Sequence, residues 1–149
     1  YWDQYARGVI IGITRGTSTA HLTRAALEGI CYQVYDVLVA MENDIHAKPK
    51  EIRVDGGAIA NNFLMQFQAD ICRCPVVRPR VLETTALGAA YLAGLAVGYW
   101  KSTDDVLQNW SVDRTFTPNI TPEERKKRVK GWNKAVRCAY HWAKDEEDE

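Results

Sequence analysis

A glycine-rich turn is the stretch of this sequence whose residue types and spacing could bind a ligand. It spans residues 54–62 and has the sequence VDGGAIANN. Gly56 and Gly57 lack a Cβ, so they accept a positive φ and let another molecule approach the backbone closely. The helix expected after the turn begins with free N–H groups and the positive end of its dipole, which favour a phosphate or a ribose hydroxyl. Asn61 and Asn62 suit either an N-cap of that helix or an amide contact to a ligand.

The same turn has a second interpretation that involves no ligand. A tight connection between a strand and a capped helix uses the same residues, and one glycine pair is a weak motif by itself. Spacing alone therefore leaves both interpretations open. No general base or phosphate loop accompanies the turn in this sequence, so we assign no catalytic residue to the chain.

The cysteines and histidines do not have the spacing of a metal site. Cys72 and Cys74 are separated by one residue, which is too close for a zinc knuckle, and no second pair lies near them. His21, His46 and His141 are scattered along the chain. We therefore expect no metal site in this sequence, and reduced thiols as in a cytoplasmic protein.

Two elements flank the turn and would position it. An apolar run at 51–54 predicts a strand that leads into the turn, and the run at 63–72 predicts a helix that leads out. The stripe of that helix consists of Phe63, Phe67 and Ile71. Because the order is strand, turn, helix, the turn would lie at the carboxyl end of a strand, where α/β proteins bind ligands.

The rest of the chain continues an α/β order with mostly parallel strands. A strand is expected at 75–81, but its two prolines deny it a central place along its whole length, so Val76 and Val77 are expected to pair and the rest to fray. The helix expected at 86–98 is apolar nearly all round and should be buried. The remaining expected elements are a strand at 9–13, a helix at 20–43, a short helix at 102–110, a connector at 115–118, a helix at about 121–143 and an acidic tail at 145–149.

Composition limits the classes of partner. The chain has 149 residues, of which 46% are apolar and 26% charged, which suits one globular domain with a real core. The formal net charge is zero, so electrostatics favours neither nucleic acid nor an anionic membrane. No apolar run is long enough to span a bilayer, so no membrane partner is expected. The first residues carry neither a methionine nor a signal peptide, and we interpret this start as a cut inside a longer protein.

Several blocks of the sequence closely resemble the bacterial-type glycerol kinases of the FGGY carbohydrate kinase family. In chain order they are RG at 7–8, GITRG at 12–16, RAALEGICYQ at 24–33, VDGGAIANNFLMQFQAD at 54–70 and ETTALGAAYLAGLAVG at 83–98. The resemblance covers essentially the whole chain but matches only the C-terminal part of the family's chain. It implies a ribonuclease-H-like, actin-like ATPase fold, with residues 1–149 forming most of the C-terminal lobe and lacking its first strands.

The resemblance also implies a function and a site. Glycerol kinases transfer the γ-phosphoryl group of ATP to glycerol, giving ADP and sn-glycerol 3-phosphate, with Mg²⁺. Matched residue by residue, Gly57 and Asn61 would contact the nucleotide, with Gly56 and Ala58 beside them. The glycerol pocket, the catalytic aspartate, both phosphate loops and most of the Mg²⁺ site would lie outside this chain, which is therefore not expected to be active alone. The resemblance further implies a homo-oligomer, a dimer or tetramer, in the cytoplasm.

Two alternatives to a glycerol kinase remain open. One is another FGGY sugar kinase, similar to xylulokinase or gluconokinase, because the residues that would select the polyol are absent. The other is a non-catalytic interaction fragment that self-associates through exposed apolar surfaces. Nucleotide titration separates this fragment from either kinase.

Overall fold

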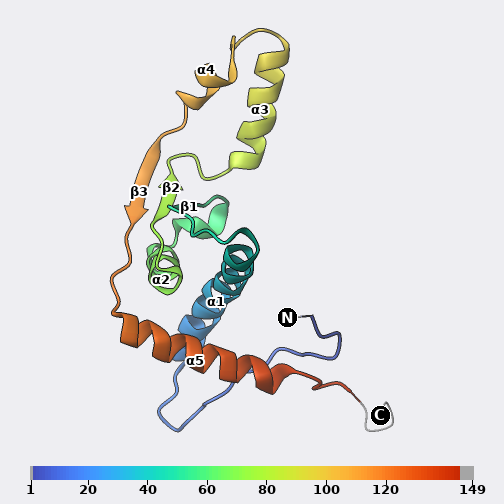
Figure 1. The fold of residues 1–149 in the computed structure, drawn as a ribbon, viewed down its shortest axis with the longest axis vertical. Helices are drawn as coiled ribbons and strands as arrows, with labels where there is room; N and C mark the ends of the chain where they lie inside the picture. Colours follow the sequence, from blue (N-terminus) through green and yellow to red (C-terminus); the bar gives the residue numbers. More distant parts are fainter. Residues whose placement is uncertain (1, 145–149) are drawn as a thin grey trace.

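The computed structural model describes residues 2–144 and shows a mixed α/β fold around a small three-stranded sheet (Figure 1). The elements in chain order are α1 (Thr19–Ile45), β1 (Ile52–Arg53), the 3₁₀ turn η1 (Gly57–Ala60), α2 (Asn62–Cys72), β2 (Val76–Pro79), α3 (Thr84–Ala96), α4 (Thr103–Leu107), β3 (Val112–Phe116) and α5 (Pro122–Ala139). The helices expected at 20–43, 63–72, 102–110 and 121–143 are therefore confirmed, with shifted ends. The acidic tail expected at 145–149 lies outside the described residues.

The sheet has the order β1-β2-β3. β1 and β2 are parallel, with Ile52 opposite Val76, whereas β2 and β3 are antiparallel. Two expectations are wrong here. The segment expected as a connector at 115–118 begins within β3, and the central strand β2 does not fray after Val77, because Arg78 and Pro79 also pair with β3. The strand accommodates Pro79 through an irregular register between Arg78 and Pro79, which is the usual way for a sheet to tolerate a missing N–H.

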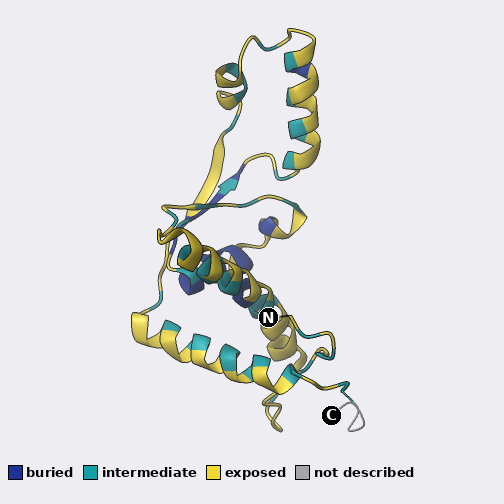
Figure 2. Ribbon diagram, turned by 45° about the vertical axis from the view of Figure 1, so that its right-hand side comes forward, coloured by how far each residue is buried: buried dark blue, intermediate teal, exposed yellow. Residues whose placement is uncertain are grey.

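The core lies where α2 meets the sheet, as the dark segments of Figure 2 show. Phe67, Ile71, Val76 and Phe116 are at most 5% exposed and belong to one cluster. The expected stripe on α2 is wrong in two ways: Phe63 is 38% exposed, whereas Gln68, which was left out of it, is buried along with most of this helix. A helix enclosed on several sides buries more than one stripe.

Helices α1 and α5 extend this core through aromatic contacts. Tyr32 on α1 stacks on Trp132 of α5, with ring centroids 5.2 Å apart and planes 9° apart, and meets Phe67 of α2 edge-on. The indole nitrogen of Trp132 donates to Asp36 at 2.7 Å. Trp132 therefore joins α5 to α1.

The strand expected at 9–13 does not form. Ile10, Ile11 and Ile13 are 67%, 52% and 62% exposed, and no strand of the described chain pairs with them. A β-branched run favours extended backbone, but a strand also requires hydrogen bonds to a neighbour. The expectation was wrong because the second condition is not met between residues 2 and 144.

Helix α3 was expected to be buried, and this is wrong for the described chain. It projects with α4 away from the core, and only Gly94 among its residues is buried (Figures 1 and 2). Leu92 is 71% exposed and Val97, just after the helix, is 83% exposed. An apolar composition indicates that a helix needs a partner, but it does not supply one.

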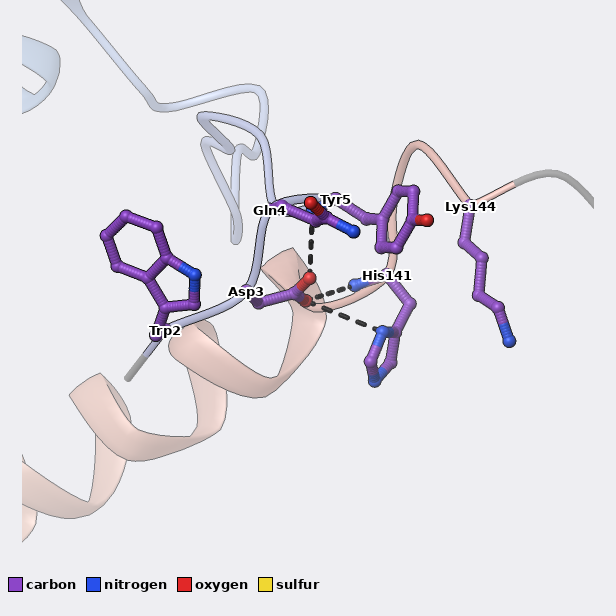
Figure 3. Close-up of a pocket in the computed structure, with 6 residues that line it drawn as sticks. All are labelled: Trp2, Asp3, Gln4, Tyr5, His141 and Lys144. Carbon is purple, nitrogen blue, oxygen red and sulfur yellow. Dashed lines mark hydrogen bonds and ion pairs between the residues drawn. The ribbon is translucent and has the colours of Figure 1, made fainter. Parts of the chain in front are cut away.

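The N-terminal segment contacts the end of α5 (Figure 3). A carboxylate oxygen of Asp3 accepts a hydrogen bond from the backbone amide of His141 at 2.7 Å, and the other oxygen accepts from the amide of Tyr5 at 2.9 Å. The backbone bond from Ala143 to Tyr5 adds to this contact. Within residues 2–144, no helix is both long and apolar enough to cross a membrane.

Candidate functional site

The glycine turn lies between the carboxyl ends of the two parallel strands. Gly56 has φ 89° and ψ 165°, a conformation that a residue with a Cβ rarely adopts. Its amide donates to the carbonyl of Leu82, beyond β2, at 2.7 Å, and its carbonyl accepts from the amide of Ile59 at 3.2 Å. The η1 turn, which was not expected from the sequence, begins at Gly57 and lies between Gly56 and α2.

The two glycines have different structural roles. Only Gly56 has a positive φ, so the expectation that both need this freedom is corrected. A Cβ built on Gly57 would meet only a carboxylate oxygen of Glu83, at 4.0 Å, which is an ordinary contact. Gly57 and Ala58 are exposed. The fold therefore does not itself require a glycine at 57, and the open backbone there is accessible to a ligand.

Asn61 caps the helix that follows. Its side-chain oxygen accepts hydrogen bonds from the amides of Phe63 at 3.0 Å and Leu64 at 3.2 Å. This confirms the capping interpretation of Asn61. The oxygen is occupied, but the side-chain nitrogen donates to no residue in the part of the chain that the structure describes, and the residue is exposed. Asn61 can therefore cap α2 and donate to a ligand at the same time.

A second group of residues, Asp55, Glu83 and Thr84, lies beside the turn and was not singled out from the sequence. The hydroxyl of Thr84, the first residue of α3, donates to a carboxylate oxygen of Asp55. Glu83 is the N-cap residue of α3 and approaches Gly57. Asp55 follows β1, whereas Glu83 and Thr84 follow β2. This placement could have identified them, because the carboxyl ends of parallel strands share one edge.

The charges around the turn favour one kind of ligand group over another. Carboxylates at Asp55 and Glu83 repel a phosphate but accept hydrogen bonds from hydroxyl and amino groups. The N-terminus of α3 adds a positive dipole end beside them. The site is thus better suited to the sugar or base of a nucleotide than to its phosphates. Among the described residues, no three histidine, cysteine, aspartate or glutamate side chains cluster as metal ligands.

A groove lies elsewhere in the molecule, away from the turn. An open groove of about 1260 Å³ runs between the N-terminal segment, α1 and α5. Ile10, Leu22, Ile30 and Val136 contribute to its mainly apolar lining. None of the turn residues at 54–62 lines it, so its size alone does not make it the site predicted from the sequence.

Comparison with known proteins gives matches over most of the chain. Residues 1–97 match the family model for the C-terminal domain of the FGGY family of carbohydrate kinases. The glycerol kinase of Parabacteroides distasonis is 74% identical over 143 residues, which are 96% of this chain and 29% of that protein. That of Dichelobacter nodosus is 59% identical over 145 residues, 97% of this chain and 29% of that protein. The chain thus spans less than a third of these relatives' length.

Solved structures show the same fold. The Plasmodium falciparum glycerol kinase with ADP aligns with 90% of this chain and 27% of its own, at 36% identity and a TM-score of 0.77. The gluconate kinase of Lactobacillus acidophilus aligns with 93% of this chain and 28% of its own, at 30% identity and a TM-score of 0.68. The expected actin-like ATPase fold class is thereby confirmed.

Proposed function

Because the chain belongs to the FGGY family of carbohydrate kinases, we propose that residues 1–149 are the C-terminal, nucleotide-binding lobe of a glycerol kinase. The whole protein would convert ATP and glycerol to ADP and sn-glycerol 3-phosphate in the cytoplasm. One observation carries this proposal: 74% identity over 96% of the chain to a protein named glycerol kinase. In this proposal the lobe would be incomplete on its N-terminal side; the β-branched segment at 9–13, which pairs with no strand of the described chain, supports this.

Within this function, the turn would hold the nucleoside part of ATP. Gly57 and Asn61 are the proposed contacts, with Gly56 and Ala58 beside them. The exposed backbone at Gly57, the free amide donor of Asn61 and the adjacent carboxylates support this role. A related solved structure, at 36% identity, is that of a kinase with ADP.

The chemistry of phosphoryl transfer would depend on residues outside this chain. The reaction requires positioning of the γ-phosphoryl group and stabilisation of its charge, usually with Mg²⁺. Between residues 2 and 144 no cluster of side chains fits a metal ion, so the Mg²⁺ site would lie mainly elsewhere in the protein. This chain would bind and orient the nucleoside and would have no activity alone.

A second sugar kinase activity remains a candidate because the fold is shared. The gluconate and xylulose kinases of Lactobacillus acidophilus both align with 93% of this chain, at 30% and 29% identity. The residues that would distinguish glycerol from a sugar are not in the turn. The high identity to glycerol kinases favours glycerol.

We also propose that the protein is a homo-oligomer, a dimer or tetramer. The exposed apolar residues on α1 and α3, among them Val37 at 59% and Leu92 at 71%, support burial of these faces in a larger assembly. For the isolated chain, the same surfaces predict self-association. A monodisperse monomer of residues 1–149 in sedimentation velocity, together with cooperative melting of that monomer, would contradict this.

The test of the function is a coupled assay of ADP release with the full-length protein. Glycerol should support turnover, whereas xylulose and gluconate should support much less. Residues 1–149 alone should give no ADP above a buffer control. Turnover with gluconate or xylulose but not glycerol would assign the chain to another member of the family, and absence of ATP binding by the full-length protein would contradict a kinase altogether.

A further inference from the structure

We infer that Arg78 positions the nucleotide-binding turn from the side opposite to Gly56, and so sets the affinity for ATP without contacting it. The inference rests on the function proposed above. Arg78 lies on the central strand β2, and nothing in the sequence pattern pointed to it. Its contacts, burial and charge partner each support a positioning role.

The first support is the set of groups that Arg78 binds on the turn. One terminal guanidinium nitrogen donates to the carbonyl of Ile59 at 2.9 Å and to the side-chain oxygen of Asn62 at 2.9 Å, and it lies 3.4 Å from the carbonyl of Ala60. Ile59 and Ala60 precede Asn61, and Asn62 follows it. The arginine therefore holds the chain on both sides of the residue proposed to donate to the nucleotide.

The second support is the way in which Arg78 is itself held. Its Nε donates to a carboxylate oxygen of Asp113 on β3 at 2.7 Å, and its guanidinium carbon lies 5.3 Å from the ring centroid of Phe116. The side chain is only 12% exposed. A planar guanidinium can bind Asp113 through one edge and the turn through the other, which a lysine could not do.

The two anchors act on opposite ends of η1. At its start, Gly56 donates to Leu82. At its end, the carbonyls of Ile59 and Ala60 face Arg78. With both anchors in place, the backbone at Gly57 and the amide of Asn61 keep a fixed separation. Loss of the second anchor would leave α2 packed but allow the end of η1 to move. Binding of ATP would then have to order this segment, which lowers the affinity for ATP.

The experiment measures ATP binding by calorimetry, and the KM values for ATP and glycerol, in the full-length protein. Arg78→Ala should raise the Kd and KM for ATP roughly tenfold, the size expected for losing charge-assisted hydrogen bonds. The KM for glycerol should change by less than about twofold, because the turn is proposed to contact the nucleotide and not glycerol. A structural defect without a positioning role would lower the melting temperature and leave the ATP Kd unchanged in the folded fraction.

Arg53→Ala is the matched control. Arg53 lies on the neighbouring strand β1, pairs with Glu51 at 2.8 Å and lies with its guanidinium carbon 4.6 Å from the ring centroid of Trp110. Among the described residues, its side chain makes no hydrogen bond to the turn. It should leave the ATP Kd within about twofold of the original protein. An equal rise in both variants would contradict the inference, because the effect would then be general to strand arginines.

Asp113→Asn keeps the test decisive should Arg78→Ala fail to fold. It removes the charge that holds Nε and preserves the shape, so the ATP Kd should rise about threefold. Unchanged ATP affinity in folded Arg78→Ala, or in Asp113→Asn, would overturn the inference. Failure of the unaltered protein to bind ATP would instead overturn the proposed function, and the two failures are therefore distinguishable.

Discussion

The amide of Gly56 donates to the carbonyl of Leu82 at 2.7 Å and joins the segments that follow two parallel strands. This bond lies beyond the last paired residues of β1 and β2. It holds Gly56 in a backbone conformation essentially reserved for glycine, and it leaves Gly57 facing outward. The stability of the turn and its capacity to bind a ligand can therefore be tested at adjacent residues.

Substitutions at the two glycines should have opposite signatures. Gly57→Val should weaken ATP binding in the full-length protein, more than Asn61→Ala does, with glycerol binding nearly unchanged, because the new side chain occupies the ligand's approach to the backbone. Gly56→Ala should mainly lower the free energy of unfolding, by about 1–3 kcal/mol, because its φ is 89°. Calorimetric titration of ATP beside a thermal melt separates the two. Unchanged ATP affinity in a well-folded Gly57→Val protein would remove the nucleotide from this turn.

Asn61 permits a separation of capping from ligand binding. Asn61→Ser retains a capping oxygen for α2 but loses the amide donor, so ATP affinity should fall by about 0.5–1.5 kcal/mol with little loss of stability. Asn61→Ala loses both groups and should lower the free energy of unfolding by a further 0.5–2 kcal/mol, roughly. Urea unfolding and ATP titration of both variants provide the comparison. Equal ATP affinity for Asn61→Ser and the original protein would assign Asn61 to capping alone.

Phe116 should be critical for stability although its segment was expected to be a connector. The ring is 2% exposed in the core, so Phe116→Ala should lower the free energy of unfolding by about 3–5 kcal/mol. Phe63→Ala is the matched control, because Phe63 is 38% exposed and should cost distinctly less. Urea unfolding monitored by circular dichroism measures both. Similar costs would place Phe116 outside the core.

The buried cysteines should react slowly with alkylating reagents at neutral pH. Burial raises the pKa of the Cys31 thiol to about 12 and that of Cys72 to about 11, so the reactive thiolate is scarce. Cys138 on α5 is exposed and should react first. Iodoacetamide labelling at pH 8, followed by mass spectrometry, gives the order. Both folded pKa values lie above the ordinary thiol value of 9.0. The stabilisation that comes from burying the neutral thiols is therefore complete below pH 9 and is lost as the pH rises through about 11–12. Faster labelling of Cys31 than of Cys138 would contradict the burial.

The contact between Asp3 and His141 should depend on pH. The hydrogen bond from the His141 amide is the main cause that lowers the pKa of Asp3 below its ordinary value of 3.8. A lowered folded pKa means that the contact stabilises the fold fully above the unfolded pKa and is lost as the pH falls through the folded one. NMR of the side-chain carboxyl carbon should place the Asp3 titration below pH 3.8. The chemical shift of the His141 amide should change over the same pH range. An ordinary Asp3 titration with no response at His141 would contradict the contact.

The sequence by itself determined the local features of this protein. The glycine turn, the cap of α2 by Asn61 and the start of α5 at Thr121 follow from residues that act within a few positions of one another. The hydroxyl of Thr121 accepts from the amide of Glu124 at 3.2 Å, as a Thr-Pro-Glu-Glu start predicts. Such features depend on backbone geometry and near neighbours, so a pattern of residue types is sufficient to identify them.

Tertiary structure alone decided which segments pair, which surfaces are buried and which groups support the turn. The same β-branched character forms a strand in β3, where β2 is beside it, and none at 9–13. The apolar helix α3 lies exposed because nothing in the described chain covers it. Arg78 reaches Ile59 across 19 positions and Asp113 across 35. Pairing, burial and contacts of this kind depend on what another part of the chain places nearby, and residue spacing within a segment carries no information about that.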